Sequence, residues 1–385
     1  MSVVVQKYGG SSVADVEKIG RVADKVAAAR RAGRDVCVVV SAMGDTTDEL
    51  LQLAKKVSPA PPRRELDMLL SAGERISMAL LSMALQERGV AAISFTGSQS
   101  GIITSDAHAA ARILEVRPFR VQEELLRGKV VIVAGYQGVS TKKEVTTLGR
   151  GGSDTTAVAL AAALGGDCEI YSDVAGVFTA DPRVVPDARR LDALSYDEMQ
   201  ELAAAGAKVL NAQAVEFAKE RGIAIHARST FGGAEETVVK GGAFPERIAG
   251  VATQRELALV ELPQAGLGEV LALLEQRGAI AAEIASPGAR AGLVLQLENV
   301  HDWPLLKGAL LAIPGVAVED ERIGSVSVVG TGLSAGHRVL REVTAVLEGL
   351  GAPPRAVFTS ALRVTAYAKA AAVADAAREL HRRLA

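Results

Sequence analysis

Aromatic residues and cysteines are scarce in this sequence. Phe, Trp and Tyr make up 3% of 385 residues, and the 2 cysteines, Cys37 and Cys168, both lie inside apolar runs. Two cysteines without metal-ligand spacing argue against a zinc cluster or a disulfide framework. We therefore expect two reduced, buried thiols and a cytoplasmic protein.

An excess of one charge is also missing, with 43 Lys and Arg against 45 Asp and Glu and a net charge of −2. This balance leaves no basic field for nucleic acid and gives no reason to expect a membrane surface as partner. The first seven residues lack the basic start and apolar middle of a signal peptide, and we find no apolar run long enough to cross a bilayer. The sequence predicts a soluble protein.

The residues that are abundant are small and apolar. Hydrophobic residues reach 49%, mostly Ala and Val, so we expect a core of small side chains. A chain of this length is long for one core and indicates two or three domains.

The most informative stretch is 146–157, Thr-Thr-Leu-Gly-Arg-Gly-Gly-Ser-Asp-Thr-Thr-Ala. Its three glycines allow the backbone to approach a ligand closely. The run 157–164, ended by two glycines, predicts a helix, and a glycine-rich turn before a helix suits phosphate or carboxylate. Arg150 and Asp154 add a cation and a carboxylate to this turn. A tight loop with a helix cap remains the alternative.

Apolar runs typical of buried strands alternate with helical patterns over the first 230 residues. The strands are expected at 3–5, 35–41, 91–96, 130–134, 168–171 and 223–227, and the helices at 16–26, from 48, 64–88, 157–164, 196–205 and 212–221. This alternation predicts an α/β fold with an open, mostly parallel sheet sandwiched by helices. Ligands bind such sheets beyond the carboxyl ends of the strands. Lys7, Ser41, Arg150, Ser172 and Asp173 all follow strands, so we expect one crevice to hold them.

Other candidate residues have ordinary alternatives. The stretch 7–12, Lys-Tyr-Gly-Gly-Ser-Ser, is a glycine turn with a lysine, but it lacks the Walker spacing. Glu74 lies among apolar neighbours on a predicted helix, where a solvated glutamate and a ligand group are both open. Asp181 with Pro182 also fits an ordinary turn, and Lys208 also fits a lysine on a helix surface.

Five stretches together closely resemble the aspartate kinase (aspartokinase) family, in the same order along the chain. They are 7–12, 40–50, 146–157, 171–174 and 178–183. The resemblance covers about the first 245 residues and implies the amino-acid kinase fold. Related kinases of acetylglutamate, glutamate, UMP and carbamate share that fold but not this set of motifs.

The resemblance implies transfer of the γ-phosphate of ATP to the β-carboxylate of L-aspartate. The products are 4-phospho-L-aspartate and ADP, at the first step of lysine, threonine and methionine biosynthesis. Lys7 would neutralise the transferring phosphate, and Asp154 would orient Lys7 and help hold Mg²⁺. Arg150 would clamp the α-carboxylate of aspartate as a bidentate fork, and Glu74 would pair with its α-ammonium.

The resemblance also implies the remaining contacts. For the substrate they are Ser41, Thr47, Gly152 and Ser153. For ATP they are Lys7, Gly9, Gly10, Ser11, Ser172, Asp173, Phe178, Asp181, Arg183, Lys208 and Val209. The family usually has tyrosine at Phe178, and a basic tripeptide where this chain has Asn211-Ala212-Gln213. That change suggests altered nucleotide affinity or altered coupling between domains.

The chain after a linker near 241–245 differs more from the family. Residues 1–245 are predicted to form the catalytic domain and 246–385 two α+β, ferredoxin-like ACT domains, with helices at 267–277 and 338–350. In the family these domains bind lysine or threonine and form a dimer. Ile280, Ala282 and Ser286 stand where relatives carry Asn, Asp and Gln, although a one-residue slip would supply Glu283. Because effector charges need partners in a closed pocket, we expect a dimer with weak or absent feedback by lysine and threonine.

The sequence also fits two other functions. One is a catalytically weak regulatory or binding protein that keeps the kinase fold. The other is a kinase of another small amino acid or carboxylate. Turnover of ATP that depends on aspartate separates them from an aspartate kinase.

Overall fold

The computed structural model describes residues 3–149, 151–242, 244–300 and 302–385. The chain forms two compact units. The first unit comprises Met1–Val177, Arg190–Gln200 and Lys208–Ala243. The second comprises Phe178–Arg189, Glu201–Ala207 and Phe244–Ala385, so it also takes in two short segments from inside the predicted catalytic stretch.

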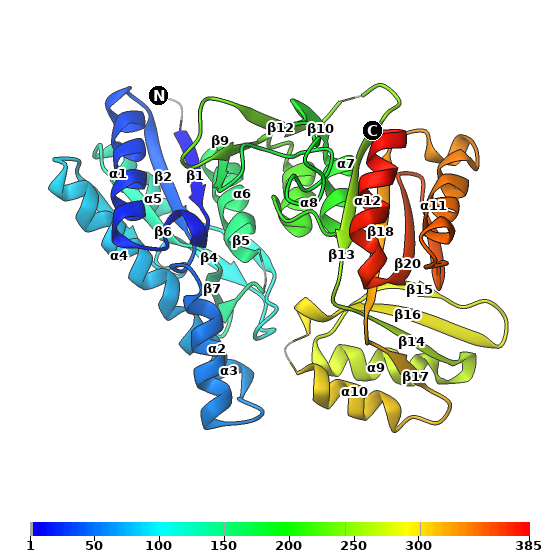
Figure 1. Cartoon of the computed structure of the whole chain (residues 1–385). Coiled ribbons are helices and arrows are strands. Elements are labelled where there is room, and N and C mark those ends of the chain that lie inside the picture. The colour runs from blue at the N-terminus through cyan, green and yellow to red at the C-terminus, as the bar shows by residue number, and fades with distance from the viewer. Residues whose placement is uncertain (1–2, 150, 243, 301) are drawn as a thin grey trace. The chain divides into compact units, whose positions relative to one another are not determined.

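The first unit is built on an eight-stranded sheet (Figure 1) with the order β10-β12-β11-β9-β1-β2-β6-β3. The strands are β1 (Val3–Tyr8), β2 (Asp35–Val40), β3 (Ala92–Phe95), β6 (Val130–Ala134), β9 (Asp167–Ser172), β10 (Ala193–Ser195), β11 (Ile225–Ser229) and β12 (Glu236–Lys240). The six strands from β11 to β3 run parallel, and β12 runs antiparallel to β11. The predicted mostly parallel sheet is confirmed.

Helices cover both faces of this sheet. Those in the first 243 residues are α1 (Val16–Arg31), α2 (Thr46–Val57), α3 (Arg63–Leu70), α4 (Ala72–Glu87), α5 (Phe119–Leu126), α6 (Gly152–Leu164), α7 (Tyr196–Ala204) and α8 (Ala212–Arg221). On one face α1 and α4 pack together over the sheet. On the other face α6 packs against β1 and α8.

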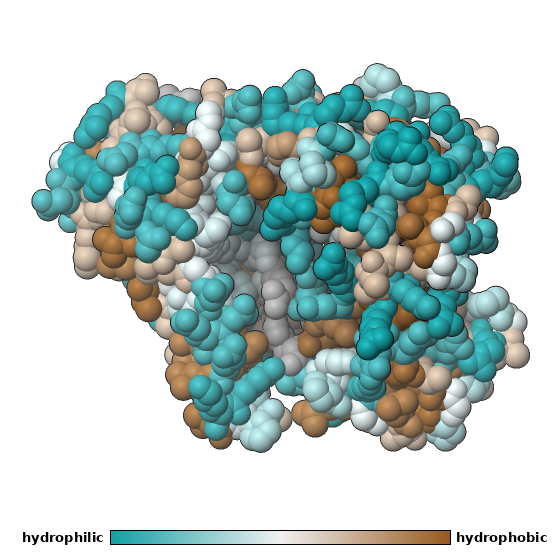
Figure 2. All heavy atoms as spheres, viewed as in Figure 1, coloured by the Kyte–Doolittle hydropathy of each residue, from teal (hydrophilic) through white to brown (hydrophobic). Residues whose placement is uncertain are grey.

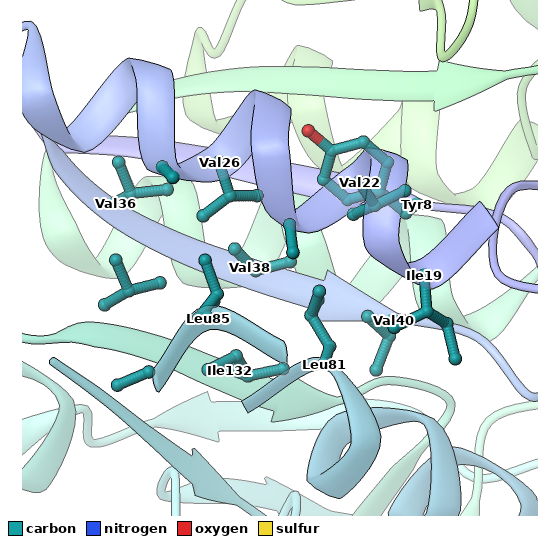
Figure 3. Packing of buried hydrophobic residues seen from close by; sticks show 14 of the residues in the cluster. Tyr8, Ile19, Val22, Val26, Val36, Val38, Val40, Leu81, Leu85 and Ile132 are labelled. Carbon is teal, nitrogen blue, oxygen red and sulfur yellow. The ribbon is translucent and has the colours of Figure 1, made fainter. Parts of the chain in front are cut away.

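The core under α1 and α4 is dominated by valine, as the composition predicts. Figure 3 shows Val22 and Val26 of α1 and Leu81 and Leu85 of α4 directed at the side chains of β2, where Val38 is central. All five are fully buried. Because side chains alternate along a strand, the other face of each strand is free to pack against α6.

A smaller four-stranded sheet lies beside the main one in the first unit, with the order β5-β4-β7-β8. Its strands are β4 (Ile102–Thr104), β5 (Ile113–Val116), β7 (Gln137–Ser140) and β8 (Val145–Thr147). The sequence reading did not predict it, because its strands are short and partly polar. It matters for the site, because β8 leads directly into the glycine-rich loop.

The predicted helix at 64–88 is two helices, α3 and α4, separated at Ser71. By length and composition alone, the helical stretch Arg63–Glu87 would be long enough to cross a membrane, contrary to the sequence reading. Half of the apolar 18-residue window within this stretch is buried inside the protein, as in a core helix, so its length and composition are weak evidence for a membrane span. Apolar residues on α2 and α4 do reach the surface, among them Val57 and Met83, and Figure 2 shows apolar colour over this region.

The second unit contains two antiparallel sheets, each covered by helices. One has the order β15-β16-β14-β17 and the other β13-β18-β20-β19. Their strands are β13 (Ile248–Gln254), β14 (Leu257–Pro263), β15 (Ala281–Ala285), β16 (Arg290–Gln296), β17 (Ala317–Glu319), β18 (Ile323–Gly330), β19 (Ala356–Thr359) and β20 (Arg363–Lys369), and the helices are α9 (Leu267–Arg277), α10 (Trp303–Leu311), α11 (Arg338–Gly349) and α12 (Ala370–Leu384).

The two predicted α+β modules are confirmed, but they are not simply consecutive. Strand β13 pairs with β18, so the module of β14–β17 is inserted within the other. The segment Phe178–Arg189 joins the module that contains β13, β18 and β20, because Ala180 and Val185 pack in the hydrophobic core of that module.

Candidate active site

Four neighbouring parallel strands, β9, β1, β2 and β6, end at the same edge of the main sheet. Ser172 and Lys7 lie near the ends of β9 and β1, Ser41 follows β2, and Gly135 follows β6. The amide of Ser41 donates to Tyr8 O at 3.1 Å, and that of Gly135 donates to Val40 O at 3.0 Å, so the strand ends are linked. This edge is where a parallel sheet binds ligands.

The closest charged contact at this edge joins Lys7 and Asp154. The Lys7 ammonium lies 2.6 Å from Asp154 Oδ1, and the two side chains are 13% and 8% exposed. Lys7 projects from the face of β1 opposite Tyr8, toward α6, where Asp154 occupies the first turn. Residues separated by about 150 positions therefore form one largely buried ion pair.

Helix α6 begins at Gly152, five residues earlier than predicted. Gly151 precedes it with φ of 72°, a left-handed conformation that glycine adopts without strain. The early start puts Ser153 and Asp154 into the first helical turn, where backbone N–H groups and the helix dipole favour negative charge. Arg150, the predicted clamp for the α-carboxylate, lies outside the described residues.

Asn211 is a site residue that the sequence reading treated only as a departure from the family. The backbone N–H of Asn211 donates to Asp154 Oδ2 at 3.2 Å. Its side-chain Oδ1 caps α8 by accepting from Gln213 N at 2.9 Å and Ala214 N at 3.2 Å. An asparagine directly before an apolar helical run is an N-cap signal, so this role was readable from the sequence.

The glycine turn after β1 packs against the loop after β2. A Cβ at Gly10 would lie 2.9 Å from Ala42 O, and Gly44 N donates to Gly10 O at 3.1 Å. A larger residue at position 10 would therefore push the two loops apart. A Cβ at Gly9 would lie 3.5 Å from Lys7 Nζ, which places that turn beside the ammonium. Ser11 is exposed in the same turn.

Glu74, in the first turn of α4, is a buried carboxylate with no cation paired to it in the described part of the chain. It is 3% exposed, and its Oε1 accepts from Ala42 N at 3.2 Å. Its Oε2 is buried and has no hydrogen-bond partner among the described residues. Burial raises the pKa of Glu74 to about 7. A buried acceptor of this kind is costly unless a ligand satisfies it.

The remaining predicted substrate residues lie in the first unit near these groups. Thr47 is half-buried in the first turn of α2, which the loop after Ser41 leads into. Ser153 is buried on α6, and its Oγ lies 2.7 Å from where a Cβ of Gly135 would stand. Ser153 therefore faces the end of β6.

The predicted nucleotide residues are divided between the two units. Ser172, Asp173, Lys208 and Val209 belong to the first unit, and Phe178, Asp181 and Arg183 to the second. The Ser172 hydroxyl oxygen accepts a hydrogen bond from Val174 N at 3.3 Å, which closes a turn, and Asp173 is exposed.

Asp181 and Arg183 pair with each other within the second unit. Arg183 donates to both oxygens of Asp181, with Nε to Oδ1 at 3.0 Å and Nη2 to Oδ2 at 2.8 Å. These two hydrogen bonds stabilise the turn at Asp181 and Pro182.

In the described part of the chain no group of three or more His, Cys, Asp or Glu side chains is placed to hold a metal ion. Asp154 lies directly beside Lys7, with its Oδ1 2.6 Å from the ammonium. A magnesium ion on a nucleotide needs one or two protein carboxylates in addition to phosphate oxygens, and each carboxylate oxygen accepts more than one contact. Asp154 fits that role.

The profile of the amino acid kinase family matches residues 2–229. An aspartokinase of Mycolicibacterium smegmatis is 45% identical over 407 residues, with 99% of this chain and 96% of the relative covered. Among solved structures, E. coli aspartokinase III in complex with aspartate and ADP (R-state) is similar with a TM-score of 0.86, 26% identity and 99% of each chain covered. The same enzyme in complex with lysine and aspartate (T-state) gives a TM-score of 0.76 with equal identity and coverage.

Proposed function

The chain belongs to the aspartokinases of the amino acid kinase family, and from this premise we propose how its residues perform the reaction. The activity is ATP-dependent phosphorylation of aspartate. A β-carboxylate oxygen of aspartate attacks the γ-phosphorus of ATP, the bond from that phosphorus to the bridging oxygen breaks, and ADP leaves. Both reactants are anions, so charge neutralisation and in-line positioning provide most of the catalysis.

The Lys7–Asp154 pair is the observation that carries this proposal. Lys7 is held by Asp154 within 2.6 Å at the edge of the sheet where ligands bind, so its ammonium is fixed before the nucleotide arrives. We assign Lys7 to the transferring phosphoryl group and Asp154 to the orientation of Lys7. An aspartate β-carboxylate is ionised at neutral pH, so Asp154 does not need to act as a base.

Glu74 supports an α-amino acid as the acceptor. Its buried Oε2 lacks a partner among the described residues, and an α-ammonium supplies both the charge and the donors that it needs. Arg150 is assigned to the α-carboxylate, with Ser41, Thr47 and Ser153 completing the substrate contacts. E. coli aspartokinase III, a structural relative, was solved with aspartate bound, which supports aspartate as the acceptor.

Mg²⁺ is part of the proposal, with Asp154 as its protein ligand beside the ATP phosphates. When bound, the ion would neutralise charge on the phosphate oxygens. The nucleotide itself is assigned to the Gly9–Ser11 turn and to Ser172, Asp173, Lys208 and Val209, all in the first unit. Phe178, Asp181 and Arg183, which the resemblance also implies for ATP, belong to the second unit.

Trapping of the product tests the proposal. Hydroxylamine converts an acyl phosphate to a hydroxamate, so the full-length protein is incubated with ATP, Mg²⁺ and hydroxylamine, plus L-aspartate or a panel of other small acids. We expect hydroxamate formation with L-aspartate, and loss of it with succinate, which lacks the ammonium. Equal rates with succinate would refute the substrate assignment. No hydroxamate with any acid would favour a regulatory or binding protein.

We also propose a homodimer formed through the ACT-like modules, with feedback by lysine and threonine weak or absent. Glu283, the acid that a one-residue slip would supply at the predicted effector positions, is engaged by Arg363 Nη2 at 2.5 Å, and the Ser286 hydroxyl donates to Gln264. Ile280 is 75% exposed. These side chains offer little to the charged groups of an amino-acid effector. Strong inhibition by millimolar lysine plus threonine would contradict this.

Location and pathway are further proposals. The two cysteines are free and buried, which supports the reducing cytoplasm. The product would enter lysine, threonine and methionine biosynthesis.

A further inference from the structure

A buried carboxylate outside the assigned site, Asp67 of α3, ties three segments of the first unit together. It is 0% exposed and accepts from Thr147 Oγ1 at 2.6 Å and from Ala109 N at 3.0 Å, both on Oδ1. His108 Nδ1 lies 2.6 Å from Oδ2, where it donates because an ionised carboxylate only accepts. The backbone at Ala109 is left-handed, with φ of 66°. This strained turn is held by the carboxylate of Asp67.

A second link lies one helical turn farther on. Gln137 Nε2 donates to Ser71 O at 2.9 Å, and Arg75 Nε donates to Gln137 Oε1 at 3.3 Å. Gln137 on β7 and Thr147 on β8 are paired directly across the hairpin. Asp67 of α3 is therefore hydrogen-bonded to Thr147, and Ser71, which follows α3, to Gln137. Thr147 and Gln137 in turn pair with each other across the hairpin. Three hydrogen bonds, from Thr147 to Asp67, from Gln137 to Ser71 O and from Arg75 to Gln137, fix α3 and the start of α4 against the β7–β8 hairpin.

Helix α4 and the loop after β8 lead to the two groups that are assigned to the acceptor amino acid. Past Ser71, α4 carries Glu74, assigned to the α-ammonium. Past Thr147, β8 runs into Leu148 and Gly149, directly before Arg150 in the sequence, which is assigned to the α-carboxylate. The loop is further held where Ala111 N donates to Thr147 O at 2.9 Å. A Cβ at Gly149 would lie 3.6 Å from Ala109 O, so the turn at 108–111 lies along this loop.

We propose that Asp67, with His108 and Thr147, is a positioning device for the acceptor amino acid. It sets the separation between the helix that carries Glu74 and residues 147–149, which directly precede Arg150 in the sequence. This inference rests on the proposed function, since it assigns the two groups to one substrate. None of the three residues is assigned a contact with ATP, so the device acts on the KM for aspartate and leaves the KM for ATP unchanged.

Thr147→Val tests the device, with Thr104→Val as the matched control. Both threonines are fully buried in the small sheet, and Thr104 Oγ1 lies 2.5 Å from Thr146 Oγ1 instead of contacting Asp67. We expect Thr147→Val to raise the KM for aspartate about tenfold, since displacing a substrate-binding group by about 1 Å costs up to 10²-fold. The KM for ATP should stay within about twofold. Thr147→Ser, which restores the hydroxyl, should restore the KM for aspartate.

Thermal unfolding of each variant separates positioning from general destabilisation. Thr104→Val loses a buried hydrogen bond of the same kind, so its melting temperature should fall similarly while its KM for aspartate stays at the wild-type value. Equal rises of the KM for aspartate in Thr104→Val and Thr147→Val would overturn the inference. So would an unchanged KM in a folded Thr147→Val.

His108 provides a second route if Thr147→Val does not fold, because its side chain is 23% exposed. His108→Ala removes the donor to Asp67 and should raise the KM for aspartate. In His108→Asn the side-chain amide can replace Nδ1, so that variant should keep the wild-type KM. An unchanged KM in His108→Ala would count against the device. A wild-type protein that forms no acyl phosphate would instead refute the function itself, which keeps the two failures distinguishable.

Discussion

The aspartate dependence of the kinase should change with pH because of Glu74. Burial raises the pKa of this carboxyl to about 7 without substrate, and only the ionised form attracts an α-ammonium. At about pH 6 roughly one tenth of the free enzyme carries an ionised Glu74, and at about pH 8 roughly nine tenths. The KM for aspartate should therefore be about tenfold higher at pH 6 than at pH 8, provided that it follows substrate affinity.

Glu74→Gln keeps the shape of the side chain but removes the charge. Leaving a substrate ammonium without its buried partner costs about 2 kcal/mol or more, which corresponds to at least about a thirtyfold rise in the KM for aspartate. The variant should also lose the change between pH 6 and pH 8. Coupled measurement of ADP release at saturating ATP, at several pH values, gives both quantities. A Glu74→Gln enzyme with the wild-type KM, or with the same tenfold pH dependence, would refute the reasoning.

The raised pKa of Glu74 also affects the stability of the protein when no substrate is bound. The folded protein binds the Glu74 proton more tightly than the unfolded chain, in which the carboxyl has its ordinary pKa of 4.5. The contribution of this group to the free energy of unfolding therefore falls as the pH rises from about 4.5 to about 7. Aspartate should offset this loss by stabilising the ionised form.

Three further predictions concern catalysis, capping and the core. Asp154→Asn should lower kcat about a hundredfold or more with small effects on both KM values, because Lys7 loses its anionic partner, and steady-state kinetics would show it; a kcat within threefold of wild type would argue against this role. Asn211→Ala should lower the free energy of unfolding in urea by about 1 kcal/mol, since α8 loses its side-chain cap; an unchanged urea midpoint would contradict the cap. Leu81→Ala should cost about 2–5 kcal/mol in the same assay, whereas Met83→Ala, 64% exposed on the same helix, should cost less than about 0.5 kcal/mol; similar losses in both would contradict the packing.

The main sheet was predictable because its signals are local. Continuous apolar runs such as 36–40 and 130–134 are long enough to mark buried parallel strands. The small sheet was missed because its strands, for example Val145–Thr147, are three to four residues long and carry polar side chains. The break at Ser71 was also missed, since serine there keeps helical backbone angles and gives no sequence signal.

The site was predictable in its parts but only partly in its connections. Lys7 and Asp154 were recognisable from motifs, and the resemblance implied that Asp154 orients Lys7, but the 2.6 Å contact itself depends on how α6 crosses β1. Asp67 gave no signal, because an aspartate in a polar helical stretch ordinarily faces solvent. Its burial arises only when β8 and the turn at 108–109 pack against α3.

The most direct test of the account is the turnover number of Lys7→Met, compared with Lys18→Met on the surface of α1. Methionine keeps the length of the side chain and removes the charge that is assigned to the transferring phosphate. Provided that both variants keep the wild-type melting temperature, kcat for aspartate phosphorylation should fall about a thousandfold or more in Lys7→Met and remain unchanged in Lys18→Met. A Lys7→Met enzyme with a kcat within about tenfold of wild type would contradict the claim that this lysine neutralises the phosphoryl group during its transfer.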